Sequence, residues 1–538
     1  MILAGFYAKI IRFIFLNFMK SFFKFLGITI FILVLIFVTL KIFQPKLLDM
    51  IFMKVGIYDQ KSEELLIENH ELSIVYSGDL SSFDPTTYSH SDRARLLNIY
   101  EGLTKLDRNM GIIPGLAKSF GILNDLEWEF TLRQGVRFHD GTDLEIEDVI
   151  ASFDKALYDQ NSKIASLLSN IKKVEKVNKQ TIKIKTLVPD ALLPAKIATV
   201  LIFPSEKKDL IYKEPIGTGP YKFVNYQENN FLKLEAFDGY WGKLPKYKYA
   251  TLNTVFLKEE RLAQMNEGLI DILDNVPIYY VDEVKNFGAK IYRKPSLEVS
   301  FLMFNLDDKE NNIFKHKQIR EAFLYAINKE EIVSLMKGYA AVSNQFAGRG
   351  ILGYSSAIKN FKYDKKRAQE LIKRVDPFYR LNAQMDTVKG VEVLGDLLKN
   401  QMFELGIDLN INYMEQVEFQ KKISKGESNF YLLNWKYDFG DISDFLTSIA
   451  HSKTEDGKYG QYNGTLYKNS VLDKMIEESE QLIDTDKRIK KLNEIMKKIV
   501  EDDILGVPLF ETDVLYAVKN GIFWEPRMDG YILATDVK

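Results

Sequence analysis

The segment from Trp435 to Leu446 holds the residues of this chain whose types and spacing best suit chemistry. An apolar run, Asn429–Trp435, predicts a buried strand, and the carboxylate of Asp438 follows the last residue of that run by three positions. A tryptophan at a strand end and one fixed carboxylate suit a pocket that has an apolar floor and binds a cationic group. The alternative is an ordinary strand-to-loop junction with solvated aspartates.

The sequence lacks the patterns of the common catalytic and metal sites. It contains no cysteine, which excludes disulfides, thiol catalysis and thiolate metal ligands. None of its five histidines lies three to five residues from another, and there is no phosphate-binding glycine loop, dinucleotide fingerprint or Gly-x-Ser-x-Gly elbow. A Ser-His-Asp set could still assemble in space, but no local pattern supports one. We therefore expect binding without turnover, and no cofactor or metal.

Composition indicates a large protein with no affinity for nucleic acid. The chain has 538 residues, 72 basic and 74 acidic, so its formal net charge is −2. This balance gives no basic footprint for a phosphate backbone. With 46% hydrophobic residues the chain can build substantial cores, and its length suggests about three domains.

The N-terminal region predicts a membrane anchor. Residues 25–40 carry no charge, and Ile42 and Phe43 extend the run past Lys41. The run is slightly shorter than the roughly 20 residues that a helix needs to cross a bilayer. A cleavable signal peptide is the alternative, but residues 39–48 offer no small-x-small cleavage site and the preceding basic stretch is long.

We therefore favour an uncleaved single-pass helix. Basic residues on its two sides nearly balance, so the positive-inside rule decides little about its orientation. The expected N-terminal organisation is a basic and apolar segment at 1–24, a transmembrane anchor at 25–43 and a linker at 44–69.

The rest of the sequence predicts an α/β body. Strand-like runs recur between Gly, Pro, Asn and Asp residues. They are Leu72–Ser77, Trp128–Leu132, Thr181–Leu187, Tyr221–Tyr226, Phe231–Phe237, Thr251–Leu257, Val299–Asn305, Asp408–Met414 and Phe430–Trp435. Apolar spacing predicts helices at 317–327 and 489–499, and Asn328 with Glu331 predicts a helix cap. Mixed strands and helices over this length indicate several layers.

Several segments in order and in register resemble the extracytoplasmic solute-binding proteins of peptide ABC importers, the dipeptide and oligopeptide-binding family. The resemblance runs from about residue 70 to the C-terminus. It is carried by Phe83–Thr86, Ile99–Leu103, Trp128–Arg133, Phe138–Thr142, Glu147–Val149, Ile216–Phe223, Tyr240–Gly242, Arg261–Leu262, Glu267–Gly268, Asp271–Ile272, Ile319–Ala322, Tyr325–Asn328, Trp435–Asp441 and Gly460–Asn463. Most of these residues suit structural roles; Gly217 and Gly219, for example, suit a tight turn because glycine tolerates positive φ.

The resemblance implies a two-lobed periplasmic-binding-protein clamshell with an extra subdomain. Lobe I would comprise 70–102, 214–295 and 505–538, the extra subdomain 103–213, and lobe II 296–504. Ligand would be trapped between the lobes by a hinge motion, and peptide backbone would be bound by strand-like hydrogen bonds.

The resemblance also implies binding residues. Family members bind the α-ammonium of the peptide with an aspartate three residues after the tryptophan, which is Asp438 here, and Trp435 and Tyr437 would line the pocket. The loop that the family uses from the opposite lobe corresponds to Tyr88, Ser89, His90 and Ser91, although His90 alone is more typical of a surface histidine.

The chain departs from the family pattern at three places. Leu432 stands where oligopeptide binders can carry an arginine, Asp441–Ile442 replaces a common Asp-Pro pair, and a membrane span replaces the secreted or lipid-anchored N-terminus. These departures leave the ligand open, because related proteins bind nickel chelates, haem, sugars or antibiotic peptides.

The sequence thus predicts a monomeric binding protein, anchored in the cell membrane, that captures short peptides on the extracytoplasmic side. It would deliver them to the permease and ATPase subunits of an ABC importer. The alternatives are a receptor for a nickel chelate, haem or another non-peptide solute, and a membrane-tethered hydrolase or chaperone.

Overall fold

The structure is a computed structural model that describes residues 71–309, 312–378 and 381–538. The predicted anchor at 25–43 and the segments on either side of it, 1–24 and 44–69, lie outside these residues. Within the part of the chain that is described, no helix has the length and apolar character to cross a membrane.

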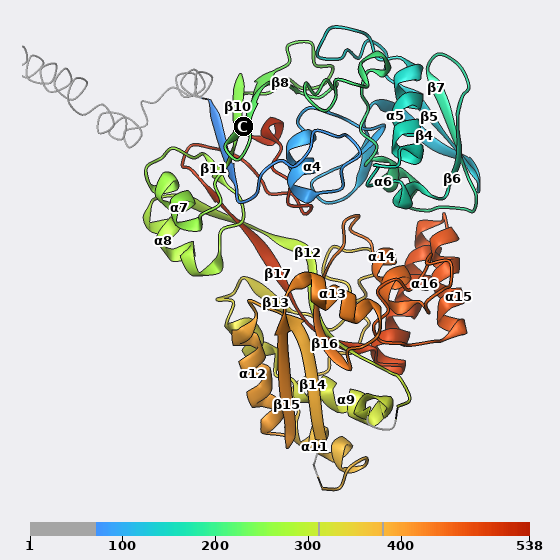
Figure 1. Cartoon of the computed structure of the whole chain (residues 1–538), viewed down its shortest axis with the longest axis vertical. Coiled ribbons are helices and arrows are strands. Elements are labelled where there is room, and N and C mark those ends of the chain that lie inside the picture. Colours follow the sequence, from blue (N-terminus) through green and yellow to red (C-terminus); the bar gives the residue numbers. More distant parts are fainter. Residues whose placement is uncertain (1–70, 310–311, 379–380) are drawn as a thin grey trace, which may run out of the picture. The chain divides into compact units, whose positions relative to one another are not determined.

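Most of the strands belong to one large sheet of eleven strands (Figure 1). Ten of them form a continuous path, and β13 (Ala340–Val342) pairs with β17 beside it. In spatial order the path is β15 (Ile407–Met414), β14 (Leu381–Val388), β16 (Phe430–Lys436), β12 (Lys290–Phe304), β17 (Gly506–Val518), β11 (Ile272–Leu273), β1 (Leu72–Tyr76), β10 (Tyr249–Thr254), β9 (Phe231–Ala236) and β8 (Tyr221–Gln227). We call the half built on β1 and β8–β11 the first lobe, and the half built on β13–β16 the second lobe.

Strands β12 and β17 are the longest in the sheet and extend through both lobes (Figure 1). They pair antiparallel from Lys290↔Val518 to Pro295↔Asp513, and again from Val299↔Glu511 onward. Between these stretches the register shifts, as it does at a β-bulge. The sequence predicted only the second part of β12 and missed β17, because a proline and three polar residues interrupt the apolar pattern of β17.

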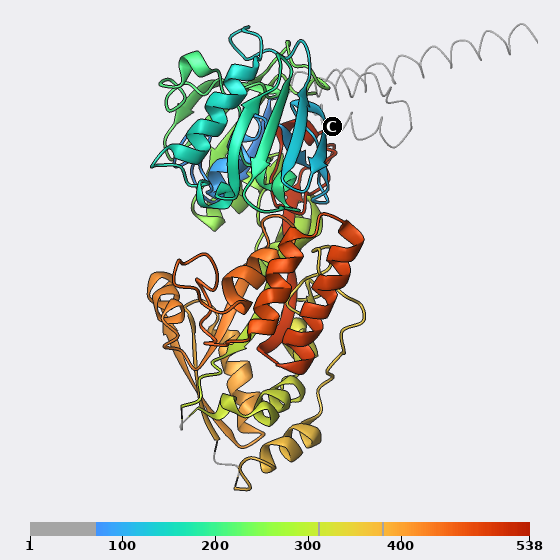
Figure 2. The same ribbon diagram turned by 90° about the vertical axis from the view of Figure 1, so that its right-hand side faces the viewer.

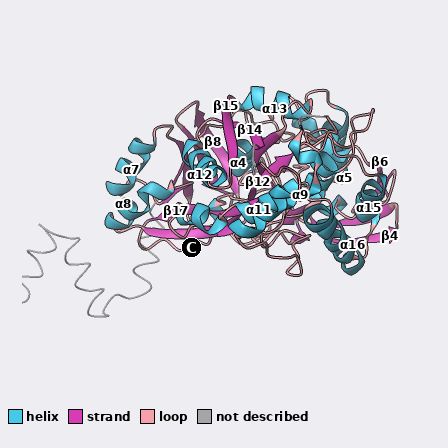
Figure 3. Cartoon of the chain, turned by 90° about the horizontal axis from the view of Figure 1, so that it is seen from below, coloured by secondary structure: helices cyan, strands magenta, loops and turns pink. Residues whose placement is uncertain are grey.

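The second lobe is built around one hydrophobic core. Stacked phenylalanines form part of it, with Phe304 4.7 Å from Phe314 and 5.5 Å from Phe430, measured between ring centroids. In Figure 3, helices α9, α11 and α12 lie in front of the strands of this lobe. Its helices are α9 (Lys317–Ala326), α10 (Lys329–Ser334), α11 (Lys365–Lys373), α12 (Glu392–Phe403), α13 (Gln416–Ser424), α14 (Ser443–Phe445), α15 (Ser470–Gln481) and α16 (Thr485–Lys497).

The two helices that apolar spacing predicted are confirmed as α9 and α16. The predicted cap is confirmed as well, because the Asn328 side chain accepts a hydrogen bond from the N–H of Glu331 at 3.2 Å. Each strand-like run of the sequence overlaps a strand of the structure.

A separate four-stranded sheet lies within the first part of the chain, facing the viewer in the upper half of Figure 2. Its core includes Phe130 and Phe153, both fully buried. The first turn of its helix α5 (Ile146–Tyr158) is acidic, as suits the positive end of the helix dipole, and Glu145 and Asp148 form a capping box. The elements are β4 (Ala117–Asn124), β5 (Glu127–Leu132), β7 (Thr181–Thr186) and β6 (Ile171–Lys176) in spatial order, with α5 and α6 (Leu193–Ile197).

The remaining elements of the first lobe border the ligand-binding region or support it. Helix α4 (His90–Leu96) and the hairpin of β2 (Thr104–Leu106) and β3 (Ile112–Pro114) follow β1 in the chain. Helices α7 (Lys258–Asn266) and α8 (Val281–Asn286) pack with β11 and β17 in a smaller core.

The expected reason for Gly217 and Gly219 is wrong. Neither glycine has a positive φ. Instead, a Cβ added to Gly217 would lie 2.1 Å from the carbonyl oxygen of Ile99, and one added to Gly219 would lie 2.6 Å from it. Glycine is needed because the 217–219 segment passes directly over the backbone after α4.

We predict that Gly217→Ala destabilises the protein by about 1–3 kcal/mol, since backbone must move to admit the methyl group. Gly121→Ala is the matched control, because its added Cβ meets nothing within 4 Å. Thermal unfolding should show a lower melting temperature for Gly217→Ala and little change for the control. Equal melting temperatures for the two variants would contradict this explanation.

Candidate ligand-binding site

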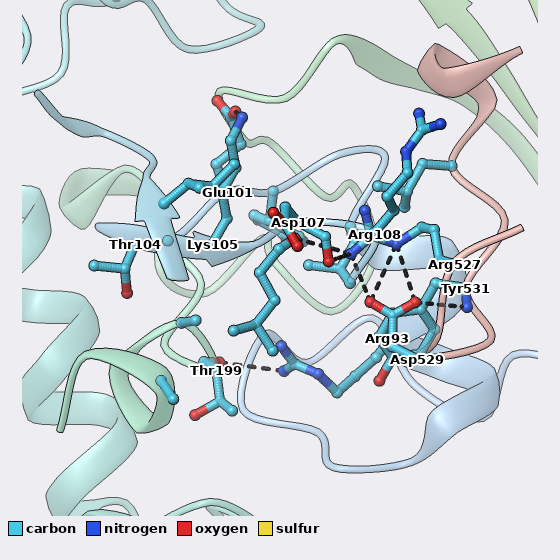
Figure 4. A pocket seen from close by; sticks show the side chains of 18 of the residues that line it. Arg93, Glu101, Thr104, Lys105, Asp107, Arg108, Thr199, Arg527, Asp529 and Tyr531 are labelled. Carbon is cyan, nitrogen blue, oxygen red and sulfur yellow. Dashed lines mark hydrogen bonds and ion pairs between the residues drawn. The ribbon is translucent and has the colours of Figure 1, made fainter. Parts of the chain in front are cut away.

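A cavity of about 450 Å³ lies where the first lobe meets the loop after β16. Its volume falls in the range of about 300–1,000 Å³ that is usual for small-molecule sites. The first lobe supplies most of its wall, and Asp438 and Phe439 come from the second lobe. Figure 4 shows part of this wall, which carries both acidic and basic side chains.

The loop that carries Asp438 is fixed from both ends. At its start, Tyr437 is fully buried, and its hydroxyl donates a hydrogen bond to the carbonyl of Phe346. At its end, Asp441 accepts two hydrogen bonds from Arg488, at 2.6 and 2.9 Å, and both side chains are at most 4% exposed. A buried bidentate pair of this kind fixes geometry strongly.

The β2–β3 hairpin of the first lobe contacts the same loop. Met110, near the hairpin tip, is buried in the core of the second lobe. Gly440 has a φ of 62°, and a Cβ added there would lie 2.9 Å from the Cβ of Met110. Glycine therefore serves two purposes at this position: it accepts the left-handed conformation, and it admits the hairpin.

The Asp438 carboxylate projects into the cavity with an unbalanced charge. Its Oδ2 accepts a hydrogen bond from the hydroxyl of Tyr88 at 2.9 Å. Within the described ranges, no lysine, arginine or histidine forms an ion pair with it. Burial raises the pKa of the Tyr88 phenol, and the Asp438 carboxylate raises it further, so Tyr88 stays a neutral donor. This hydrogen bond joins the two lobes.

Two other residues predicted beside Asp438 do not line the cavity. Tyr437 lies in the core of the second lobe, as described above. The Trp435 ring packs against Phe445 and Tyr462, and its indole N–H donates to Asp444 at 3.3 Å. Both aromatic residues support the loop from behind.

The predicted loop at 88–91 is only partly at the cavity. Tyr88 and His90 line it, with the His90 ring 4.8 Å from that of Tyr531 and its Nε2 3.0 Å from the Asp529 carbonyl. Ser89 is the N-cap of α4, and its hydroxyl accepts from the N–H of Asp92. The Ser91 hydroxyl donates to the carbonyl of Asp79 at 3.0 Å. The two serines therefore shape the loop.

Asp444 is a second carboxylate near Asp438. Burial raises its pKa to about 8; the hydrogen bond from Trp435 lowers it, and the negative charge of Asp438 raises it further. The neutral form of Asp444 thus prevails at neutral pH, while Asp438 carries the negative charge that faces the cavity.

Sequence reasoning missed the basic side chains of the cavity. Arg93, Lys105, Arg108 and Arg527 all line it. It also missed Glu101, which accepts hydrogen bonds from Thr218, Tyr240 and Trp241 at 3.2, 3.0 and 2.7 Å. Arg93, Leu97 and Tyr100 follow i, i+4, i+7 spacing, which could have indicated one common face.

The described residues hold no group of three His, Asp or Glu side chains that could bind a metal ion. The arrangement suits recognition of charged groups on an organic solute.

Comparison with known proteins identifies the kind of molecule. Residues 111–457 match the model of bacterial extracellular solute-binding proteins, family 5. The glutathione-binding protein GsiB of Salmonella paratyphi A is 28% identical over 427 residues, covering 75% of this chain and 81% of GsiB.

Solved structures show the same fold. The periplasmic binding protein DppA of Helicobacter pylori, in complex with the peptide STSA, matches with a TM-score of 0.70 and 22% identity, over 89% of this chain and 99% of DppA. NikZ of Campylobacter jejuni, in complex with Ni(L-His), matches with a TM-score of 0.70 and 22% identity, over 87% and 99% of the two chains.

These matches confirm the two-domain α/β periplasmic-binding-protein fold and the expectation of a binding protein rather than an enzyme. The chain belongs to the bacterial extracellular solute-binding proteins of family 5, the non-enzymatic substrate-binding components of ABC importers.

Proposed function

We propose that this protein captures short peptides by their free α-ammonium group and delivers them to an ABC importer. The observation that carries this proposal is the Asp438 carboxylate, which faces the cavity on a fixed loop without a cationic partner among the described residues. This carboxylate is exposed, and a cationic group of a ligand can pair with it through charge-assisted hydrogen bonds.

The relatives support a ligand built from amino acids. GsiB is described as a glutathione-binding protein, and DppA was solved with the peptide STSA. We also propose that the lobes and the extra subdomain have the boundaries expected from the sequence. Opening of the lobes about β12 and β17 would admit the peptide, and closure would enclose its terminus beside Tyr88 and Asp438, which are hydrogen-bonded across the lobes in this structure.

We further propose that residues 25–43 anchor the protein in the cell membrane, with the binding body on the extracytoplasmic side, and that the protein acts as a monomer. This proposal rests on the uncharged run in the sequence.

Replacing Asp438 by Asn should weaken peptide binding by about 2–5 kcal/mol, since the ammonium would be left without its counter-charge. Calorimetric titration of the full chain in detergent with mixed short peptides measures this. Asp408→Asn, which alters an exposed carboxylate on β15, is the control. N-acetylated peptides should bind far more weakly to the wild-type protein, and unchanged affinity in either comparison would refute the assignment.

Peptide binding should release a proton near neutral pH. Asp444 has a pKa of about 8, so it is largely protonated at pH 7 in the free protein. An ammonium bound at Asp438 favours the charged form of Asp444, which lowers its pKa and expels the proton. Affinity should therefore rise from pH 6 to pH 7; above that, the rise is opposed by loss of the proton from the peptide's own α-ammonium, whose pKa is about 7.7–8.0.

Calorimetry at pH 7 in two buffers of different ionisation enthalpy measures the protons released. Asp444→Asn keeps a side-chain oxygen for Trp435 but cannot titrate, so it should abolish both the buffer dependence and the rise in affinity. An Asp444→Asn variant that still releases the proton would assign it to another group.

The membrane proposal predicts that the full chain stays with the membrane fraction after an alkaline carbonate wash. A chain lacking residues 1–43 should be released. Release of the full chain by carbonate would contradict an integral anchor, and a mass that lacks the N-terminal segment would show that it is cleaved.

A further inference from the structure

One face of α4 and the turn after it forms part of the cavity wall. Arg93, Leu97 and Tyr100 all line the cavity. They lie on one face because the helical hydrogen bonding continues past α4. The backbone N–H of Leu97 donates to the carbonyl of Arg93 at 3.1 Å, and the N–H of Tyr100 donates to the carbonyl of Leu96 at 2.8 Å. The face therefore brings one guanidinium and one phenol to the cavity wall, and the hydroxyl of that phenol is buried.

Arg93 is a buried cation without a counter-charge. Its side chain is 6% exposed. It donates to the carbonyls of Thr199 and Thr87 at 3.2 and 3.5 Å, and its guanidinium also interacts with the Tyr531 hydroxyl. Across residues 71–309, 312–378 and 381–538, no carboxylate forms an ion pair with it.

The other two arginines of the cavity wall differ from Arg93 in this respect. Arg527 pairs with Asp529 at 2.5 Å, and Arg108 pairs with Glu525. A buried guanidinium that lacks an anion is costly, because carbonyl groups only partly replace its hydration. Arg93 is therefore the guanidinium of this wall that an incoming anion would stabilise most.

Tyr100 is a buried donor without a partner. Its side chain is fully buried, and among the described residues its hydroxyl has no hydrogen-bond partner. Burial raises the pKa of this phenol, so it stays protonated and able to donate. An unsatisfied buried hydroxyl costs about 1–3 kcal/mol, which a ligand oxygen can recover.

Arg93 and Asp438 act on the same part of the cavity from opposite lobes. Both charges influence the phenols of Tyr88 and Tyr531, Arg93 lowering their pKa values and Asp438 raising them. Yet Arg93 and Asp438 form no ion pair with each other. A ligand with separated charges can satisfy both.

We propose that Arg93 and Tyr100 form a carboxylate-binding subsite, so that the protein selects solutes with both a free ammonium and a free carboxylate. This inference rests on the proposed function, in which Asp438 binds the ammonium. The guanidinium supplies charge and directional N–H donors, and the Tyr100 hydroxyl supplies a further donor. The carboxylate is either the peptide C-terminus or an acidic side chain.

The test uses the full chain in detergent and pools of synthetic di- to pentapeptides. One pool has free termini and no acidic residue; a second is the same pool with C-terminal amides; a third carries amides and one glutamate; a fourth has N-acetyl groups and free C-termini. Bound peptides are separated from free ones and quantified by mass spectrometry. Retention of the first pool should exceed that of the second by about tenfold or more.

The third pool distinguishes the source of the carboxylate. Recovery of retention with the glutamate pool shows that the subsite accepts a side-chain carboxylate, and its absence shows that it requires the C-terminus.

Four variants, one of them a control, separate a binding role from a structural one. Arg93→Met should remove the preference for peptides with free C-termini over those with C-terminal amides, and Arg93→Lys should keep part of that preference. Tyr100→Phe should weaken retention of the first pool without lowering the melting temperature, because the hydroxyl it deletes bonds to no described residue. Arg137→Met, which removes an exposed arginine that does not line the cavity, should leave the preference intact.

The outcomes also separate this inference from the proposed function. If the wild-type protein retains peptides with free C-termini and peptides with C-terminal amides equally, the carboxylate subsite is refuted and Asp438 remains the ammonium site. Equal retention of acetylated and free peptides overturns the role of Asp438 and leaves the subsite. Retention of no pool overturns both, and an unchanged preference in Arg93→Met assigns the carboxylate to another residue.

Discussion

The pairing of β12 with β17 is the constraint on which the rest of the structure depends, because these two strands run through both lobes. Their ladder shifts register twice: the larger interruption places Ser296, Leu297 and Glu298 opposite Thr512 alone, and the second shift lies between Ser300 and Phe301. Ion pairs hold β17 on both sides of the interruption: Arg293 pairs with Asp513 and Arg349 with Glu511, and both carboxylates are about 5% exposed or less. An interruption of this kind is a place where a paired ladder can bend, as the lobe closure proposed above requires.

The cavity wall shows two charges that the protein itself does not neutralise. Asp438 faces the cavity from the second lobe and Arg93 from the first, and neither forms an ion pair among the described residues. Each charged residue is nevertheless held in place. The ion pair of Asp441 with Arg488 fixes the loop of Asp438, and the Thr199 carbonyl accepts a hydrogen bond from Arg93. In the proposed function the ligand supplies both missing counter-charges, so binding and closure would stabilise each other. This would give selectivity for the ends of a peptide with little dependence on its side chains.

The sequence predicted well what depends on neighbouring residues. The strand-like runs, the Asn328 cap and the position of Asp438 after a buried strand all follow from local periodicity and capping. It predicted poorly what depends on distant segments. Gly217 must be glycine because of its close contact with the Ile99 carbonyl. The position of the Arg93 side chain depends on a carbonyl 106 residues away, and that of Tyr437 on a hydrogen bond from its hydroxyl to the Phe346 carbonyl within the core. Strand β17 was missed because its alternation is broken where it crosses between the lobes.

The most direct test of the central claim is native mass spectrometry of the full chain purified from its own cells in detergent, followed by denaturation and identification of the released solute. We expect a set of short peptides with free amino termini. A single nickel chelate, haem or sugar would contradict it: the fold and the transport role would stand, but Asp438 would lose its role as the ammonium site.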